Sequence, residues 1–235
     1  SRLGGEVLID HRFGTSKLRI GEAEIDLAIA RRESYAHPGA LPDVVIGNIY
    51  EDLGRRDFSI NAMAISLSDG TFGTLLDLFD GRRDLERGLI RVLHSNSFVD
   101  DATRILRAVR YASRLGLRLE GETELFLTSS LGYLNAIGGD RVRHELARMF
   151  REPLPAKALR MAQDLDVLTA IHQDLKIESE VLVKMRSISM EPTSENDLRL
   201  LALMVFSVSA RTLPQIVERL NMDGRWATVA GDVSL

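Results

Sequence analysis

The first part of the chain alternates between apolar and polar positions, which is the pattern of short β-strands. Three segments carry it: residues 6–10, 16–20 and 24–29. In the last of these, Ile25, Leu27 and Ile29 occupy one side of the predicted strand, and Asp26 lies on the opposite side. The alternation therefore predicts a strand that presents one apolar side and one polar side.

The pattern becomes irregular after this segment. Residues 31–42 contain two prolines and a glycine and are predicted to form a loop. A helix is predicted over 49–57, leading into an apolar stretch. Further along, Asp69-Gly70 predicts a hairpin turn between strands at 65–67 and 74–77.

Beyond residue 98 the apolar positions follow the period of helices. Helices are predicted over 101–117, 123–130 and 140–150. Pro153 and Pro155 mark a boundary, and residues 191–194 (EPTS) supply a later break and capping signal.

Strands followed by helices favour an α+β fold. The expected organisation is a head with a mixed sheet and helices, residues 1–98, followed by an all-α neck, 99–152, and an all-α body, 153–235.

Composition narrows the class of protein. The 235 residues carry 30 basic and 34 acidic side chains, a net charge of −4, which excludes a strongly basic nucleic-acid-coating protein. The absence of Cys excludes disulfides and thiol nucleophiles. No apolar run approaches the roughly 18 residues of a membrane span. Charged side chains among the first 20 residues argue against a signal peptide, so no membrane partner and a cytoplasmic location are expected.

The predicted helix at 101–117 has an unusual polar side. Four arginines lie opposite its apolar side: Arg104, Arg107, Arg110 and Arg114. Residues 102–119 contain no Asp or Glu that could pair with them locally. Either these guanidinium groups form a solvated surface, or they bind an external anion such as a triphosphate or an RNA backbone.

Two further sets of side chains could carry chemistry. In the segment 55–61 (RRDFSIN), paired arginines can clamp phosphates and Asn61 can hold a sugar hydroxyl, although charges at a helix surface are common. Asp26 is either a solvated carboxylate or part of a magnesium site, if other carboxylates converge on it.

Taken in order, several segments resemble the class II tRNA nucleotidyltransferases (CCA-adding enzymes) and the related bacterial poly(A) polymerases. They are IDLAIARRESY (25–35), PGALP (38–42), EDLGRRDFSINA (51–62), DLFDGRRDL (77–85), DDATRILRAVR (100–110) and RVRHEL (141–146). The resemblance extends from about residue 3 to 175 and implies a nucleotidyltransferase head, with a neck and body that hold the tRNA acceptor end.

The resemblance also implies roles for single residues. The implied nucleotide-binding set is Arg56, Asp57, Asn61, Asp101, Arg104, Arg107 and Arg110. Within it, Asp101 and Arg104 are expected at the base edge, where a carboxylate accepts from the exocyclic amine of C or A and a guanidinium donates to the ring. As positions i and i+3 of one predicted helix, they would be neighbours. Arg141 and Glu145 match a pair that braces this helix.

The expected chemistry is transfer to a 3′-hydroxyl with Mg²⁺ as cofactor. Asp26 matches the third acidic position of the family's catalytic site and is the implied catalytic and metal-binding residue. The family's Asp-x-Asp pair and its Gly-Gly-x-x-Arg-Asp turn are absent from these 235 residues, so this polypeptide by itself is expected to be inactive.

The favoured hypothesis is a template-independent enzyme that adds CCA to tRNA from CTP and ATP. The alternatives are an A-adding enzyme or poly(A) polymerase and, from another class, a non-catalytic RNA-binding helical protein. A CC-adding enzyme is less favoured, because the resemblance associates such enzymes with a shortened region at 31–42. The oligomeric state stays open.

Overall fold

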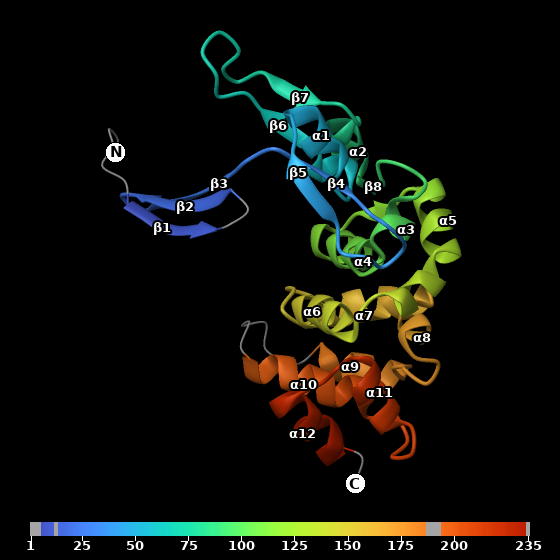
Figure 1. The fold of residues 1–235 in the computed structure, drawn as a ribbon. Helices are drawn as coiled ribbons and strands as arrows, with labels where there is room; N and C mark the ends of the chain where they lie inside the picture. Colours follow the sequence, from blue (N-terminus) through green and yellow to red (C-terminus); the bar gives the residue numbers. More distant parts are fainter. Residues whose placement is uncertain (1–5, 12–13, 187–193, 234–235) are drawn as a thin grey trace.

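The computed structural model describes residues 6–11, 14–186 and 194–233. The chain runs from strands at one end of an elongated, curved molecule to helices at the other (Figure 1). A hairpin-like sheet formed by the first strands extends to one side of the remaining chain (Figure 1). The order of strands and helices confirms the predicted α+β class.

In the described residues the strands form four small sheets. β1 (Glu6–His11), β2 (Thr15–Ile20) and β3 (Ala23–Ala28) form an antiparallel sheet. The other pairs are β4 (Arg31–Ser34) with β5 (Asp43–Ile46), β6 (Met63–Ile65) with β7 (Leu75–Asp77), and β8 (Leu89–Ile90) with β9 (Arg118–Leu119). Only β8 and β9, among these described pairs, are parallel.

The three predicted N-terminal strands and the hairpin around Asp69-Gly70 are confirmed. The predicted loop at 31–42 is partly wrong, because β4 begins it and pairs with β5. Its prolines start only at Pro38, so Arg31–Ser34 are free to extend. On and just after β3, Ile25, Leu27 and Ile29 are 41 %, 49 % and 49 % exposed, so their shared side is not buried.

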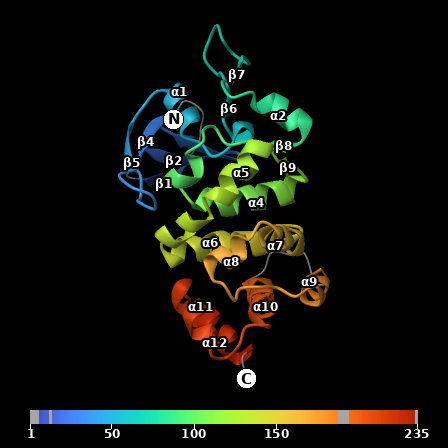
Figure 2. The same ribbon diagram turned by 90° about the vertical axis from the view of Figure 1, so that its right-hand side faces the viewer.

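The helices follow one another down the molecule (Figure 2). The first helical elements along the chain are α1 (Ile49–Gly54), the 3₁₀ turn η1 (Ser59–Asn61), α2 (Gly81–Arg87) and α3 (Ser97–Asp100). Next come α4 (Thr103–Leu115), α5 (Gly121–Ser129), the 3₁₀ segment η2 (Leu131–Ala136), α6 (Gly139–Phe150), α7 (Pro155–Asp164) and α8 (Val167–Ile171). The end of the chain supplies α9 (Ser179–Met185), α10 (Ser194–Val205), α11 (Leu213–Arg219) and α12 (Gly224–Val233).

Several helices begin or end at other residues than predicted, and the residues at their ends explain most of these differences. The predicted helix at 49–57 ends at Gly54, before the double arginine. The predicted helix at 101–117 is α4, which starts two residues later because the backbone of Asp101 is extended; Asp101 Oδ1 accepts from the backbone N–H of Thr103 at 3.0 Å. Gly116, with φ of 68°, terminates it. The predicted break at 191–194 falls on a stretch whose first three residues lie outside the described ones; Ser194 begins α10.

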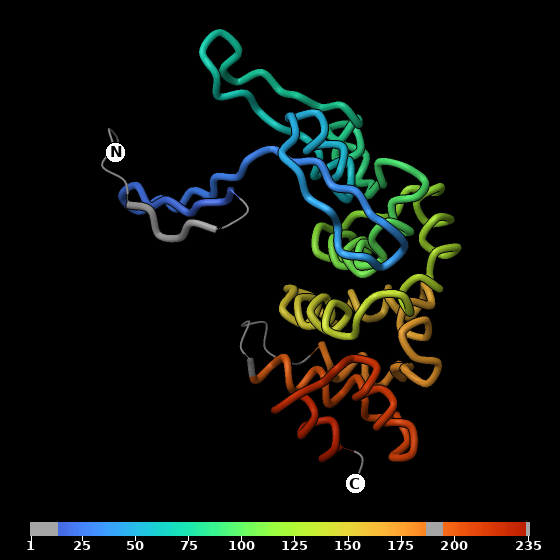
Figure 3. The backbone as a smooth tube through the Cα atoms, in the orientation of Figure 1, coloured from blue at the N-terminus to red at the C-terminus, as the bar shows by residue number. Residues whose placement is uncertain are grey.

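The apolar side of α4 lies at the centre of the molecule. Ile105, Leu106, Ala108 and Val109 are fully buried in a core that extends without interruption from Phe58 to Ala230. The tube trace shows α4, the α6–α7 pair and the last helices as successive layers (Figure 3). The predicted boundaries at 98/99 and 152/153 stay predictions. Among the described residues, no helix combines the length and apolarity needed to cross a membrane.

The turn η1 is held in place from α2. Ser59 Oγ donates to the buried Asp84 carboxylate at 2.7 Å, and Arg91 binds the same carboxylate at 2.9 and 3.0 Å. At Gly81 a Cβ atom would lie only 2.2 Å from the Ser59 carbonyl oxygen, so glycine permits this close approach. These contacts fix the segment that carries Asn61.

Candidate functional site

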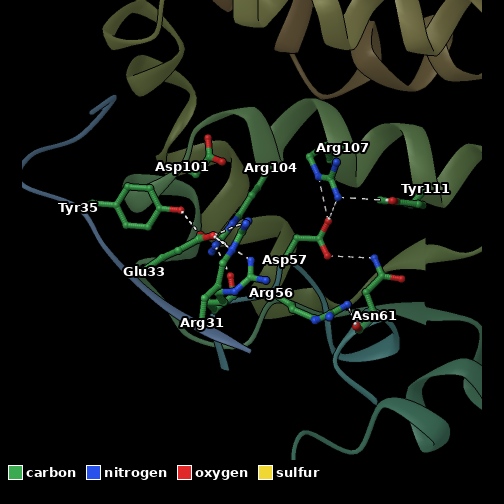
Figure 4. Close-up of a pocket in the computed structure, with 11 residues that line it drawn as sticks. Arg31, Glu33, Tyr35, Arg56, Asp57, Asn61, Asp101, Arg104, Arg107 and Tyr111 are labelled. Atoms are coloured by element: carbon green, nitrogen blue, oxygen red, sulfur yellow. Dashed lines mark hydrogen bonds and ion pairs between the residues drawn. The ribbon is translucent and has the colours of Figure 1, made fainter. Parts of the chain in front are cut away.

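A cavity of about 480 Å³ opens between β4, the α1–η1 segment and α4 (Figure 4). It is lined by Arg31, Glu33, Tyr35, Arg55, Arg56, Asp57, Asn61, Asp101, Arg104, Arg107 and Tyr111. Five of these side chains are arginines and three are carboxylates, so the lining is net positive. Several guanidinium groups around one cavity fit a ligand with more than one anionic oxygen.

The double arginine is oriented by Asp52 on α1. Arg55 Nη2 donates to Asp52 Oδ1 at 2.7 Å, and Arg56 Nη2 donates to Oδ2 at 3.0 Å. The backbone N–H of Arg31 adds a bond of 3.2 Å. Burial acts to raise the pKa of Asp52, but these donors outweigh it and lower that pKa below its usual value.

Asp57 is the centre of a second group of bonds. Its Oδ2 accepts from Arg107 Nε at 2.9 Å, and its Oδ1 accepts from Asn61 Nδ2 at 3.0 Å and from the Phe58 backbone N–H at 2.9 Å. Burial acts to lower the pKa of Arg107, yet the neighbouring Asp57 carboxylate raises it overall. Arg107 therefore projects into the cavity as a fixed cation (Figure 4).

Asp101 and Arg104 meet at the same cavity, although Asp101 precedes α4 and is not part of it. Asp101 Oδ1 accepts from Thr103 Oγ1 and from Arg141 Nη2, both at 2.7 Å. Within the described residues, the other oxygen, Oδ2, has no hydrogen bond. Arg104 is 5 % exposed and donates to Ser97 Oγ and to the Arg55 carbonyl oxygen, each at 2.7 Å.

Glu33 and Tyr35 complete the wall, and the sequence reasoning assigned neither of them a role. Tyr35 Oη donates to Glu33 Oε2 at 3.2 Å, and Glu33 Oε1 accepts from Arg55 Nη1 at 2.9 Å. Burial raises the pKa of Tyr35 to about 12, so its hydroxyl remains a donor. The available signal was the segment RRESY (31–35), which belongs to the resemblance but was interpreted as a loop.

Tyr111 was also missed. Its ring is surrounded by the guanidinium groups of Arg107, Arg110 and Arg114, whose carbons lie 5.4, 4.7 and 4.8 Å from the ring centroid. An aromatic ring among three arginines has no obvious signature in a sequence, apart from its position on the arginine-bearing side of α4.

Of the predicted site residues, the structure brings together Arg56, Asp57, Asn61, Asp101, Arg104 and Arg107. Arg110 is not among the lining residues. It is 7 % exposed, and its Nη1 donates to Glu152 Oε1 at 2.9 Å.

The arginines of α4 have no acidic partner on their own helix, as the sequence indicates, but Arg107 and Arg110 pair with carboxylates from elsewhere in the chain. Their partners come from distant segments: Asp57 for Arg107, and Glu145 and Glu152 for Arg110. The pairs are 42 residues apart for Glu152 and 50 for Asp57, so no local count of charges could find them.

Asp26 is not brought to the cavity. It lies on β3, where its side chain is 79 % exposed and pairs with Lys17 Nζ at 3.3 Å. The described residues contain no group of three or more His, Asp or Glu side chains placed to hold a metal ion. A lone carboxylate beside an ammonium group does not fit Mg²⁺, which needs several oxygen ligands.

Arg141 and Glu145 are predicted as a brace for α4; in the described part of the chain Arg141 reaches Asp101 just before the helix, Glu145 reaches its polar side, and the two do not pair with each other. Arg141 holds Asp101, whereas Glu145 lies 3.4 Å from Arg110 Nε and bonds Arg148. The pair thus braces the start and the middle of α4 separately.

Comparison with known proteins gives three kinds of match: a family model, protein relatives and solved structures. Residues 2–91 match the model of the poly A polymerase head domain. The chain is 45 % identical over 174 residues to an A-adding tRNA nucleotidyltransferase from Halalkalibacterium halodurans, covering 72 % of this chain and 41 % of that protein. The chain therefore spans less than half the length of that relative.

Solved structures extend the similarity over nearly the whole chain. A CCA-adding enzyme, described as apo form II, superposes with a TM-score of 0.84 and 32 % identity over 97 % of this chain and 56 % of that one. A tRNA nucleotidyltransferase complexed with a primer tRNA and an incoming ATP analog gives 0.78 and 32 % over 98 % and 68 %.

Proposed function

Because the chain belongs to the class II tRNA nucleotidyltransferase family, we propose that its cavity holds the incoming nucleoside triphosphate of an enzyme that extends the 3′ end of tRNA. The observation that carries this proposal is the meeting of Asp101, Arg104, Arg56 and Arg107 around one positive cavity. ATP is the substrate that both candidate activities, CCA addition and A addition, have in common.

The base is read by Asp101 and Arg104. Asp101 Oδ2 accepts from the exocyclic amine of adenine or cytosine, and Arg104 donates to the adjacent ring nitrogen. Guanine and uracil carry a carbonyl oxygen in place of that amine. This oxygen would face Asp101 Oδ2, and two hydrogen-bond acceptors repel each other. Ser97 and the Arg55 carbonyl fix the Arg104 guanidinium before any ligand binds, which limits the entropy lost on binding.

The phosphates are bound by the remaining arginines. Asp57 lies between Arg107 and Asn61, and Arg56 lies beside Asn61, whose amide binds the sugar (Figure 4). Bidentate guanidinium–phosphate contacts orient the α-phosphate for attack by the 3′-hydroxyl of the RNA, which releases pyrophosphate. For the whole protein, Mg²⁺ as cofactor and tRNA and CTP as partners remain proposals.

Two observations favour different members of the family. The resemblance of the motifs favours an enzyme that adds CCA from CTP and ATP. The 45 % identity to an A-adding relative, against 32 % to the CCA-adding structure, favours the second candidate, addition of the terminal A alone.

The test uses the full-length protein with Mg²⁺ and a tRNA transcript that ends at the base before CCA, with CTP and ATP supplied together. Products resolved to one nucleotide and extended by CCA would establish the first candidate. Extension only of a transcript that already ends in CC would establish A addition, and a long A tail would indicate a poly(A) polymerase. RNA binding without any extension would support the non-catalytic alternative and overturn the proposal.

A further inference from the structure

The charges on α4 continue beyond the cavity as an alternating chain of acids and bases. Asp57 Oδ2 lies 2.9 Å from Arg107 Nε, and Arg107 Nη1 lies 4.0 Å from Glu145 Oε1. Glu145 Oε2 in turn lies 3.4 Å from Arg110 Nε, and Arg110 Nη1 lies 2.9 Å from Glu152 Oε1. One end of this chain lines the cavity, and the other end lies outside it.

The outer members of the chain are buried. Arg110, Glu145 and Glu152 are 7 %, 4 % and 8 % exposed. Charges at this depth depend on their partners, since water cannot replace a lost one. Arg148 and Arg114, which also approach the two glutamates, are 57 % and 40 % exposed in their side chains and can exchange their partners for water.

The middle link is incomplete. Arg110 Nε and Glu145 Oε2 face each other at 3.4 Å, yet neither atom has a hydrogen-bond partner among the residues that the structure describes. The strong bond of Arg110 is made at its other end, to Glu152. Glu152 thus holds the Arg110 guanidinium just short of Glu145.

We propose that Glu152 is a positioning residue for the cavity, acting on Arg107 through Arg110 and Glu145. Arg107 and Arg110 both approach the single carboxylate of Glu145, whose Oε1 also accepts from the more exposed Arg148. While Glu152 neutralises Arg110, Glu145 stays available to Arg107. Without the Glu152 charge, Arg110 closes onto Glu145, and Arg107 keeps only Asp57 as an acidic partner, beside its 3.4 Å contact with Tyr111 Oη.

The position of Glu152 connects the cavity to the junction between α6 and α7. It lies between the end of α6 and the start of α7, and it is not among the residues that line the cavity. A displacement at the α6–α7 junction is therefore transmitted to a guanidinium in the cavity through ion pairs and without movement of the apolar core. The inference rests on the proposed function only in naming a nucleotide as the ligand of Arg107.

The first test measures the Kd for ATP by calorimetric titration, in the full-length protein with and without the Glu152→Gln substitution. The substitution keeps the shape and removes the charge, and we expect the Kd for ATP to rise about fivefold. Glu180→Gln, at an exposed position on α9, is the matched control and should leave the Kd unchanged. Glu152→Asp, which keeps the charge, should lie closer to the unaltered protein.

The second variant separates positioning from general stability. Arg110→Met combined with Glu152→Gln removes the competing cation as well, so Glu145 returns to Arg107 and the Kd should recover. A double variant that binds ATP more weakly than Glu152→Gln alone would overturn the proposal.

A readout without ligand separates this inference from the proposed function. In ¹⁵N-edited NMR spectra, exchange of the Arg107 Nε proton with water should accelerate in Glu152→Gln. Unchanged exchange would overturn the positioning role even where ATP binds. Failure of the unaltered protein to bind ATP would instead overturn the proposed function, while the exchange rates still decide whether Glu152 positions Arg107.

Discussion

Arg141 Nη2 donates to Asp101 Oδ1 at 2.7 Å, across 40 residues of sequence. The same guanidinium reaches the carbonyl oxygen of Gly39 at 3.4 Å, in the segment between β4 and β5. One side chain of α6 thus connects that segment to the carboxylate that precedes α4. The bond occupies Oδ1, which leaves Oδ2 as the oxygen that Asp101 can offer to a ligand.

Arg141→Ala should therefore weaken nucleotide recognition, although Arg141 is not among the residues that line the cavity. Asp101 loses one of the donors that orient it, and we expect the KM for ATP to rise about tenfold, with more misincorporation of GTP and UTP. Single-nucleotide extension assays with each triphosphate measure both effects. Arg225→Ala, at an exposed position on α12, is the control. An unchanged KM and base preference would show that Asp101 does not depend on Arg141.

Arg104→Ala should change both selectivity and stability. The buried guanidinium bonds Ser97 and the Arg55 carbonyl, and its loss leaves these groups unsatisfied, at a cost of about 2 kcal/mol. The corresponding fall in Tm is roughly 4–8 °C. Thermal unfolding followed by circular dichroism measures the loss of stability, and the identity of the incorporated base measures the change in selectivity. A loss of affinity with intact base selectivity would assign Arg104 to the phosphates.

Asp26→Ala should leave ATP affinity unchanged, because Asp26 is exposed on β3 and outside the cavity. The exposed ion pair with Lys17 also adds little stability, because water screens it. Titration with ATP and thermal unfolding check these two expectations. Turnover in the full-length protein then tests the catalytic role implied by the resemblance, and normal turnover would remove Asp26 from the site.

Tyr35 should make the stability of the protein fall at alkaline pH. In the unfolded chain its hydroxyl loses its proton near pH 10, whereas burial raises the folded-state pKa to about 12. The contribution is therefore complete below pH 10 and is lost as the pH rises through 12. Urea unfolding across this window should show a steeper loss for the unaltered protein than for Tyr35→Phe. Parallel curves would contradict the raised pKa.

The sequence was sufficient for those parts of the fold that depend on local pattern. The alternation around Asp26 located β3, and the spacing of Ile105 and Val109 located α4. The extent of burial was not local: Leu27 alternates as a buried residue does, yet it is 49 % exposed. Periodicity gives the direction of a side chain, but it does not say what covers that side.

The same distinction holds for the cavity. Arg104 and Arg107 were identified from one helix, because their spacing places them on one side of it. Arg110 shares that side, but its pairing with Glu152 turns it into the interior. Glu33 escaped notice because its role depends on Arg55, 22 residues away.

The side chains that line the cavity determine how the attraction between the cavity and its ligand depends on pH. Its five cations are guanidinium groups, which hold their charge at every pH that a cell meets. None of the eleven lining residues is a histidine, the side chain that titrates near neutrality. A phosphate-bearing ligand, in contrast, takes up a proton as the pH falls through about 6. Near neutrality, the arginines contribute an attraction that does not vary with pH, and the ligand brings the variable charge.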